Sequence, residues 1–161
     1  MENVLLSVHV LASIVFVGGV AVATSLFPRY APVAEPVSAP AAGAPPGAAV
    51  PSEDERSRRV ALSLHRVTRV YSFLGALVPM AGIALAVAQG RMGEIWVNVS
   101  MALTAAAAVL LAWQIHPRQR RALAVPGDVK ALSRLSMVTG VFNLLWATVV
   151  VLMIVRPGDH A

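Results

Sequence analysis

Four stretches of the chain contain no Asp, Glu, Lys or Arg, and each is long enough to cross a lipid bilayer as a helix. They cover residues 3–28, 70–90, 95–115 and 135–155. The hydrocarbon core of a bilayer is spanned by about 20 apolar residues in a helix. Lipid cannot satisfy an open backbone, and these runs are too short and too rich in Ala and Leu for barrel hairpins. The pattern predicts an all-α, polytopic membrane four-helix bundle.

The composition agrees with a membrane protein. Only 13% of the 161 residues are charged and 57% are hydrophobic, with a mean hydropathy of +0.71. A soluble domain has about a quarter of charged residues. We therefore expect a single transmembrane domain over residues 1–161, with spans at about 3–28, 60–90, 94–115 and 132–155. The chain starts Met-Glu-Asn, with an acid and no base, which argues against a cleaved signal peptide.

The positive charges predict the orientation. Eleven of the thirteen Lys and Arg residues lie in or beside the first and third loops, and the exceptions are Arg91 and Arg156. Because cytoplasmic loops of membrane proteins are enriched in Lys and Arg, both termini should face outward, with the first and third loops in the cytoplasm. Trp96 and Trp113 are expected to anchor the third span at the two interfaces. The bacterial cytoplasmic (inner) membrane is the expected location.

The segment 29–52 is rich in Pro and Ala. Seven of the eleven prolines lie between Pro28 and Pro51, which is typical of a disordered or polyproline-like linker rather than a domain. We expect this linker to be cytoplasmic. Ser52 and Glu55 fit a capping box, so the second helix should start near Glu53.

Small residues recur at helical spacing in each span, and membrane helices pack through such faces. We expect these faces to line the interior of the bundle, and Pro79 to kink the second span because proline removes a backbone donor. The predicted inward residues are His9, Ala12, Ser13, Phe16, Gly19 and Ala23 in the first span, Ser72, Gly75, Pro79, Gly82 and Ala86 in the second, Asn98, Ala102, Ala105 and Ala112 in the third, and Ser136, Gly140, Asn143 and Ala147 in the fourth.

The candidate functional residues are polar groups at membrane depth. His9 is the one titratable side chain between Asn3 and Pro28, and a polar ring inside a membrane is a functional candidate by default. Its expected partners are Asn98 or Asn143, and a packing histidine bonded to one of them or to a backbone carbonyl is the alternative. His65 and His116 lie near the cytoplasmic ends of the second and third spans and can meet, although solvated interfacial histidines are the simpler interpretation.

Several function classes find no support. No Asp or Glu lies inside a span, which argues against an ion-coupled transporter. The chain has no cysteine, so thiolate metal sites, iron–sulfur clusters and covalently attached haem are excluded. The methionines do not form a pair at Met-x-x-Met spacing, and no metal site is predicted. Nucleic acid is not an expected partner, since no aromatic residues alternate with the basic ones. No residue is identified as catalytic.

The stretch SVHVLASIVFVGGVAVATSLFPRY resembles the first span of HemJ-type protoporphyrinogen oxidases and related CopD-like proteins, which are bacterial four-helix membrane proteins. HRVTRVYSFLGALVPMAGIALAVAQG and NLLWATVVVLMIVRPG resemble their second and last spans. The resemblance covers the four spans but not the first loop. It implies haem b as cofactor, with His9 as an iron ligand. The family also has a Lys in the third span shortly after a Trp, where this chain has Ser100, so the resemblance does not extend to the oxidase reaction.

Two functions stay open at this point. One is a haem b-binding redox protein that uses His9, with Asn98 and Asn143 as partners in its pocket. The other is a non-enzymatic accessory or scaffold subunit of a larger membrane complex. In either case the expected partners are the lipid bilayer and other membrane subunits or further copies of the chain. The sequence does not identify a substrate, a redox partner or an oligomeric state, and it leaves open whether the protein is an enzyme.

Overall fold

The structure is a computed structural model that describes residues 2–33, 53–125 and 129–158. Its regular elements are helices, and four of the continuous helical stretches are long and apolar enough to cross a membrane. The predicted all-α class with four long apolar helices is therefore confirmed. The stretches are Asn3–Tyr30, Glu53–Ala88, Ile95–Ala124 and Val129–Val155.

The first helix continues past Pro28 to Tyr30, so the predicted linker at 29–52 begins too early. Its residues 34–52, including the Ser52 of the predicted capping box, lie outside the described residues. The second helix begins at Glu53, as expected, and three acids occupy its first turn. Acidic side chains there complement the positive end of the helix dipole.

Two of the spans contain a π-helical segment. The first consists of α1 (Glu2–Ala12), η1 (Ser13–Val17) and α2 (Gly18–Tyr30), and the third of α5 (Ile95–Leu110), η2 (Leu111–Ile115) and α6 (His116–Ala124). A π turn bonds each N–H to the carbonyl five residues back and so accommodates one extra residue. Pro117 lies two residues after the end of η2, and proline can neither donate to the carbonyl four residues back nor tolerate it in close contact. The widened turn relieves that conflict.

The second span is broken. It comprises α3 (Glu53–Gly75) and α4 (Leu77–Ala88), and Ala76 lies between them. Pro79 has no N–H to donate to the carbonyl of Gly75, and the N–H of Ala76 instead bonds the carbonyl of Phe73 at 3.2 Å. The kink predicted from Pro79 is thus confirmed. The fourth span is a single helix, α7 (Val129–Val155).

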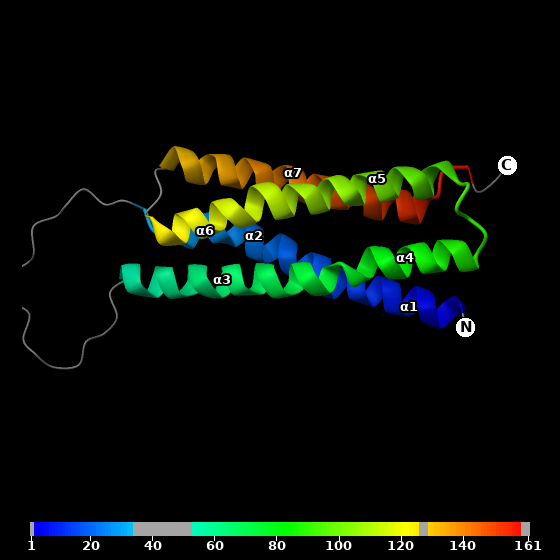
Figure 1. Cartoon of the computed structure of the whole chain (residues 1–161), viewed down its shortest axis with the longest axis horizontal. Coiled ribbons are helices and arrows are strands. Elements are labelled where there is room, and N and C mark those ends of the chain that lie inside the picture. The colour runs from blue at the N-terminus through cyan, green and yellow to red at the C-terminus, as the bar shows by residue number, and fades with distance from the viewer. Residues whose placement is uncertain (1, 34–52, 126–128, 159–161) are drawn as a thin grey trace, which may run out of the picture.

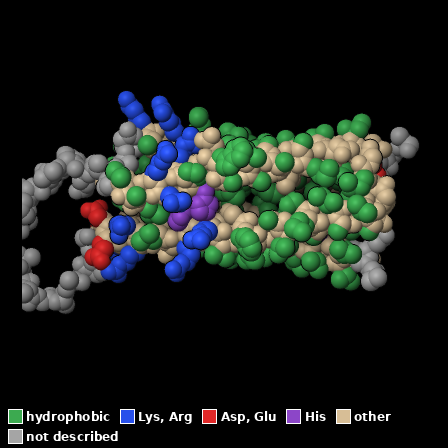
Figure 2. Space-filling model, in the orientation of Figure 1, with side chains coloured by type: hydrophobic (Ala, Val, Ile, Leu, Met, Phe, Trp, Pro, Cys, Tyr) green, Lys and Arg blue, Asp and Glu red, His purple; other side chains and the backbone are tan. Residues whose placement is uncertain are grey.

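The four spans form a ring of neighbours (Figure 1). α2 packs on α3 and α7, α5 packs on α7, α3 packs on α6, and α1 packs on α4, whereas α4 and α5 make few contacts. The N- and C-termini lie at one end of the bundle, which we call the terminal end. Lys and Arg side chains gather at the other end, over α3 and α6, and we call this the basic end (Figure 2).

The hydrophobic core is concentrated toward the basic end, where α2, α3, η2, α6 and the first half of α7 meet. The most buried large side chains there, from Phe27 on α2, Ile115 on η2 and Leu135 on α7, are at most 1% exposed. Close packing of this kind, rather than exclusion from water, holds membrane helices together.

The predicted inward faces of the first two spans are confirmed, since their residues are buried or half-buried. The predicted faces of the third and fourth spans are wrong. Asn98, Ala102, Ala105 and Ala112 are exposed, as are Ser136, Gly140 and Ala147, while Asn143 is half-buried. The residues that do point inward are Val97, Ser100, Ala107 and Ile115 in the third span, and Leu132, Leu135, Thr139, Phe142 and Val149 in the fourth. Most of them have larger side chains than the Ala, Gly and Ser residues predicted to point inward.

Candidate functional site

His9 lies on α1 with its imidazole turned toward α4, and the side chain is only 6% exposed. Its ring lies near the backbone of Val78. Gly82 makes this approach possible, because a Cβ there would lie 3.0 Å from His9 Cε1 and 3.6 Å from each ring nitrogen. The Nδ1 atom is buried and has no hydrogen-bond partner among the described residues. His9 is therefore a packed polar group with one of its two nitrogens unused.

The structure does not bring His9 together with either predicted asparagine. Asn98 is exposed in the first turn of α5, and its amide donates to the carbonyls of Met92 and Glu94 at 3.2 and 3.0 Å. The prediction that it lines an interior pocket is wrong, because these loop carbonyls hold its side chain outside the bundle. Asn143 on α7 donates to the hydroxyl of Ser25 on α2 at 2.9 Å.

A cavity of about 150 Å³ lies in the middle of the bundle. The three interruptions of regular helix all reach it: η1 through Phe16 and Val17, the break at Ala76, and η2 through Leu111. The hollow between α4 and α5 is visible in Figure 2. The remaining lining residues are Val20, Tyr71, Ser72, Gly75, Pro79, Thr104, Ala108, Phe142 and Trp146.

This cavity offers binding rather than chemistry. Its walls are mainly apolar and aromatic, and it is partly open between the helices. The hydroxyl of Ser72 is already used, since it donates to the carbonyl of Thr68 at 2.5 Å. The indole N–H of Trp146 is buried without an acceptor among the described residues. The cavity thus brings together no acid, base or nucleophile pair of the kind that covalent catalysis requires.

His65 and His116 meet near the basic end, as their sequence positions allow. Their rings are in edge-to-face contact with centroids 4.9 Å apart. The interpretation of both as solvated is wrong for His65, which is half-buried and bonds the Gln119 side chain (Nδ1 to Oε1) at 2.9 Å. His65 Nδ1–H donates in this bond and the Gln119 side-chain oxygen accepts. The amide nitrogen of Gln119, Nε2, is buried and has no partner among the described residues. The trio joins the second span to the third.

Neither histidine site gathers enough ligands for a metal ion. Within residues 2–33, 53–125 and 129–158, no group of three or more His, Cys, Asp or Glu side chains lies close enough to hold one. His9 contacts α4, whereas His65 and His116 lie at the contact of α3 with α6, so they belong to separate parts of the bundle.

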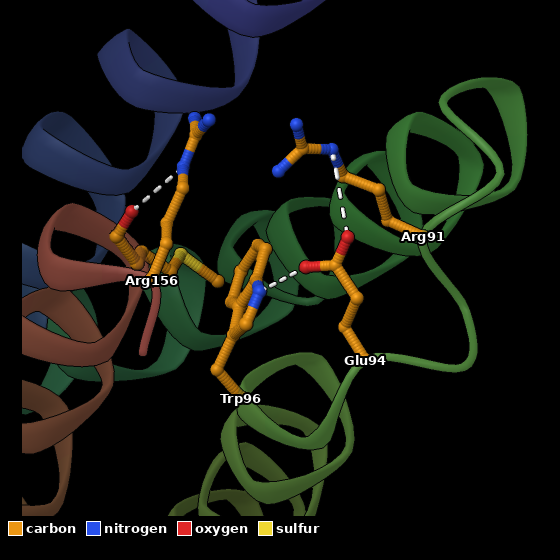
Figure 3. Close-up of polar contacts among 5 residues, drawn as sticks. Arg91, Glu94, Trp96 and Arg156 are labelled. Atoms are coloured by element: carbon orange, nitrogen blue, oxygen red, sulfur yellow. Dashed lines mark hydrogen bonds and ion pairs between the residues drawn. The ribbon is translucent and has the colours of Figure 1, made fainter. Parts of the chain in front are cut away.

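The terminal end carries a polar cluster that joins the α4–α5 loop to the end of α7 (Figure 3). Arg91 pairs with Glu94 at 3.8 Å, and the Glu94 carboxylate also accepts the indole N–H of Trp96. The guanidinium of Arg156 lies over the Trp96 ring at 5.9 Å, and its Nε donates to the carbonyl of Met153 at 3.4 Å. Both basic residues of this end are thus engaged by neighbouring groups. Trp96 lies in the first turn of α5, at the end of the helix where an interfacial tryptophan is expected.

Sequence reasoning missed several of these features. Gln119 gave no signal, because a glutamine between arginines reads as solvent-facing, yet it is fully buried. Pro117 was a usable signal for η2, whereas η1 has no proline nearby. The hydroxyl of Ser100 is buried and has no partner among the described residues.

The comparisons with known proteins add no relative to this picture. No protein-family model, no curated protein and no solved structure matches the chain. Its function must therefore be inferred from its own residues.

Proposed function

We propose that the chain is a small multi-pass protein of the bacterial cytoplasmic membrane that serves as a non-enzymatic accessory or scaffold subunit of a larger membrane assembly. The observation that supports this function is the outward small-residue face of α7. The site chemistry agrees with it, since the described residues place polar groups where they join helices to each other and offer no catalytic pair.

The outward face of α7 has the spacing of a helix-packing surface. Ser136, Gly140, Asn143 and Ala147 follow one another at intervals of four, three and four residues, and all but Asn143 are exposed. A Cβ added to Gly140 would meet nothing within 4 Å. In membranes, such small-residue faces let the backbone of a second helix approach closely. Within the chain, this face is used only where Asn143 bonds Ser25 on α2, and its exposed members Ser136, Gly140 and Ala147 are left for a helix of another subunit.

The proposed orientation places the basic end in the cytoplasm and both termini outside. Eleven of thirteen Lys and Arg residues support it. At the terminal end, Arg91 pairs with Glu94, and Arg156 contacts the Trp96 ring and a backbone carbonyl. These contacts make the two arginines weaker signals for a cytoplasmic location than the arginines of the basic end.

A pull-down in mild detergent tests the subunit function. We expect the tagged full-length chain to retain a membrane partner, and Gly140→Leu to abolish that retention because the added side chain keeps the second backbone away. Val141→Leu is the matched control, since Val141 is also exposed on α7 but lies off this face. Recovery of only monomer or homo-oligomer from the wild type, or equal retention by both variants, would count against the proposal.

A second candidate function is haem b binding and redox activity through His9. The buried, unpartnered Nδ1 favours it. The surroundings of His9 fit a haem less well. Gly82 lies against the imidazole ring, and the mid-bundle cavity is not lined by His9. A porphyrin would require α1 and α4 to separate. When bound, haem would supply one-electron chemistry that the side chains do not.

The absorption spectrum decides this candidate. If His9 ligates haem, protein purified from cells with ample haem shows a Soret band that His9→Ala removes and His160→Ala leaves intact. Absence of the band, or a band unchanged in the His9 variant, would reject haem ligation by His9 and leave the subunit function unaffected.

A further inference from the structure

A groove of about 350 Å³ lies between α6 and the start of α7, at the basic end of the bundle. It differs from the mid-bundle cavity in being both charged and apolar. Three arginines from two helices line it together with small and aliphatic side chains. The lining residues are Arg118, Arg121, Ala122, Val125, Ala131, Leu132, Arg134 and Leu135.

The charge of the groove is not balanced by the described residues around it. One of the guanidinium nitrogens of Arg118, Nη1, is buried and has no hydrogen-bond partner among the described residues. Among the described residues, ion pairs join Arg59 to Glu55 and Arg91 to Glu94, and neither pair is part of this groove. In the sequence, Asp128 is the one acid between Glu94 and Asp159, and it lies outside the described residues. An anion is the ligand that such a set of guanidinium groups prefers.

The floor of the groove selects among anions. Ala122, Leu132 and Leu135 are buried and line the groove together with the arginines, and Val125 adds an exposed apolar side chain. A free phosphate ion would leave these carbon surfaces unused. A phospholipid would place its phosphate against the guanidinium groups and its glycerol and first acyl carbons over the leucines. The position also fits, because arginines at the ends of apolar spans lie at the depth of lipid headgroups.

We infer that this groove binds one anionic phospholipid, with its phosphate between Arg118, Arg121 and Arg134. The site requires that the helices lie in a bilayer, but not that the chain is a subunit of an assembly. It would fix a lipid at the contact of the third and fourth spans, where α6 and α7 make few contacts of their own.

Native mass spectrometry of the full chain in mild detergent tests the site, with phosphatidylglycerol and phosphatidylcholine of identical acyl chains as probes. We expect one phosphatidylglycerol to bind with about tenfold preference, because its headgroup carries a net negative charge that basic residues attract, whereas phosphatidylcholine is zwitterionic. The triple variant Arg118→Gln, Arg121→Gln, Arg134→Gln should lose that preference. Inorganic phosphate at millimolar concentration should not displace the lipid.

The control is a second triple variant, Arg56→Gln, Arg58→Gln, Arg66→Gln, which removes three exposed arginines from α3 at the same end. It should keep the preference. Because Arg118 is half-buried, the double variant Arg121→Gln, Arg134→Gln keeps the test valid if the triple variant does not fold. Equal losses in the α6–α7 variants and the control, no preference in the wild type, or displacement by inorganic phosphate would overturn the assignment.

Discussion

Replacing Phe27 with alanine is expected to lower the free energy of unfolding by about 3 kcal/mol, whereas Phe73→Ala should leave it nearly unchanged. Phe27 is 0% exposed in the core of the bundle, and Phe73 is 81% exposed on its outer surface. Truncating a buried Phe costs about 3–5 kcal/mol in water-soluble proteins. We take the lower end, because lipid is as apolar as the core and the loss is mainly one of packing.

The comparison uses unfolding of the purified protein in mild detergent by increasing amounts of sodium dodecyl sulfate, followed by circular dichroism. The two phenylalanines differ in burial but not in chemistry, so the control removes the general effect of losing an aromatic side chain. Similar midpoints for the two variants would show that the interior around Phe27 is not packed as described.

Gly19→Ala should destabilise the protein by about 1–3 kcal/mol, the usual cost of overpacking. A Cβ at Gly19 would overlap Cδ2 and Cε2 of the Tyr71 ring on α3. That ring cannot easily turn away, because it is in edge-to-face contact with Phe16, with centroids 5.9 Å apart. α2 and α3 would have to move apart to admit the methyl group.

The neighbouring glycine provides the control for this prediction. A Cβ added to Gly18 meets nothing within 4 Å, so Gly18→Ala should be neutral or slightly stabilising, since alanine favours helix. In the background Tyr71→Ala, the penalty of Gly19→Ala should shrink. Thermal melts of the four proteins in the same detergent give the comparison, and equal melting temperatures for the two glycine variants would contradict the close approach of α2 to α3.

The sequence predicts the spans because exclusion of charge from lipid leaves a direct trace in it. It also predicts the break near Pro79, which follows from local chemistry, and it allows the meeting of His65 with His116 because both lie at the same end of their spans. It does not predict which faces of the third and fourth spans point inward. In water, the inner face of a helix is the apolar one, but in lipid both faces are apolar and residue size is an ambiguous substitute.

The candidate site was harder to predict for the same reason. Burial of His9 follows from its place in an apolar run, but its contact with α4 depends on Gly82, a position that no rule of spacing pairs with residue 9. Asn98 is predicted to point inward because it shares a helical face with Ala102 and Ala105, whereas its amide donates to carbonyls of the loop before the span. The groove between α6 and α7 depends on how these two helices pack, which single-sequence patterns do not give.

The three interruptions of regular helix at η1, Ala76 and η2 border the same cavity, whereas α7 crosses the bundle without a break over Val129–Val155. Stiffness should therefore differ among the helices. Three of the four long helices are interrupted beside this cavity, and only α7 connects the two halves of the bundle without an interruption. We expect bending of the bundle to concentrate at these interruptions, with the continuous α7 resisting it. A partner helix packed on α7 would stiffen that helix and so reduce bending of the whole bundle.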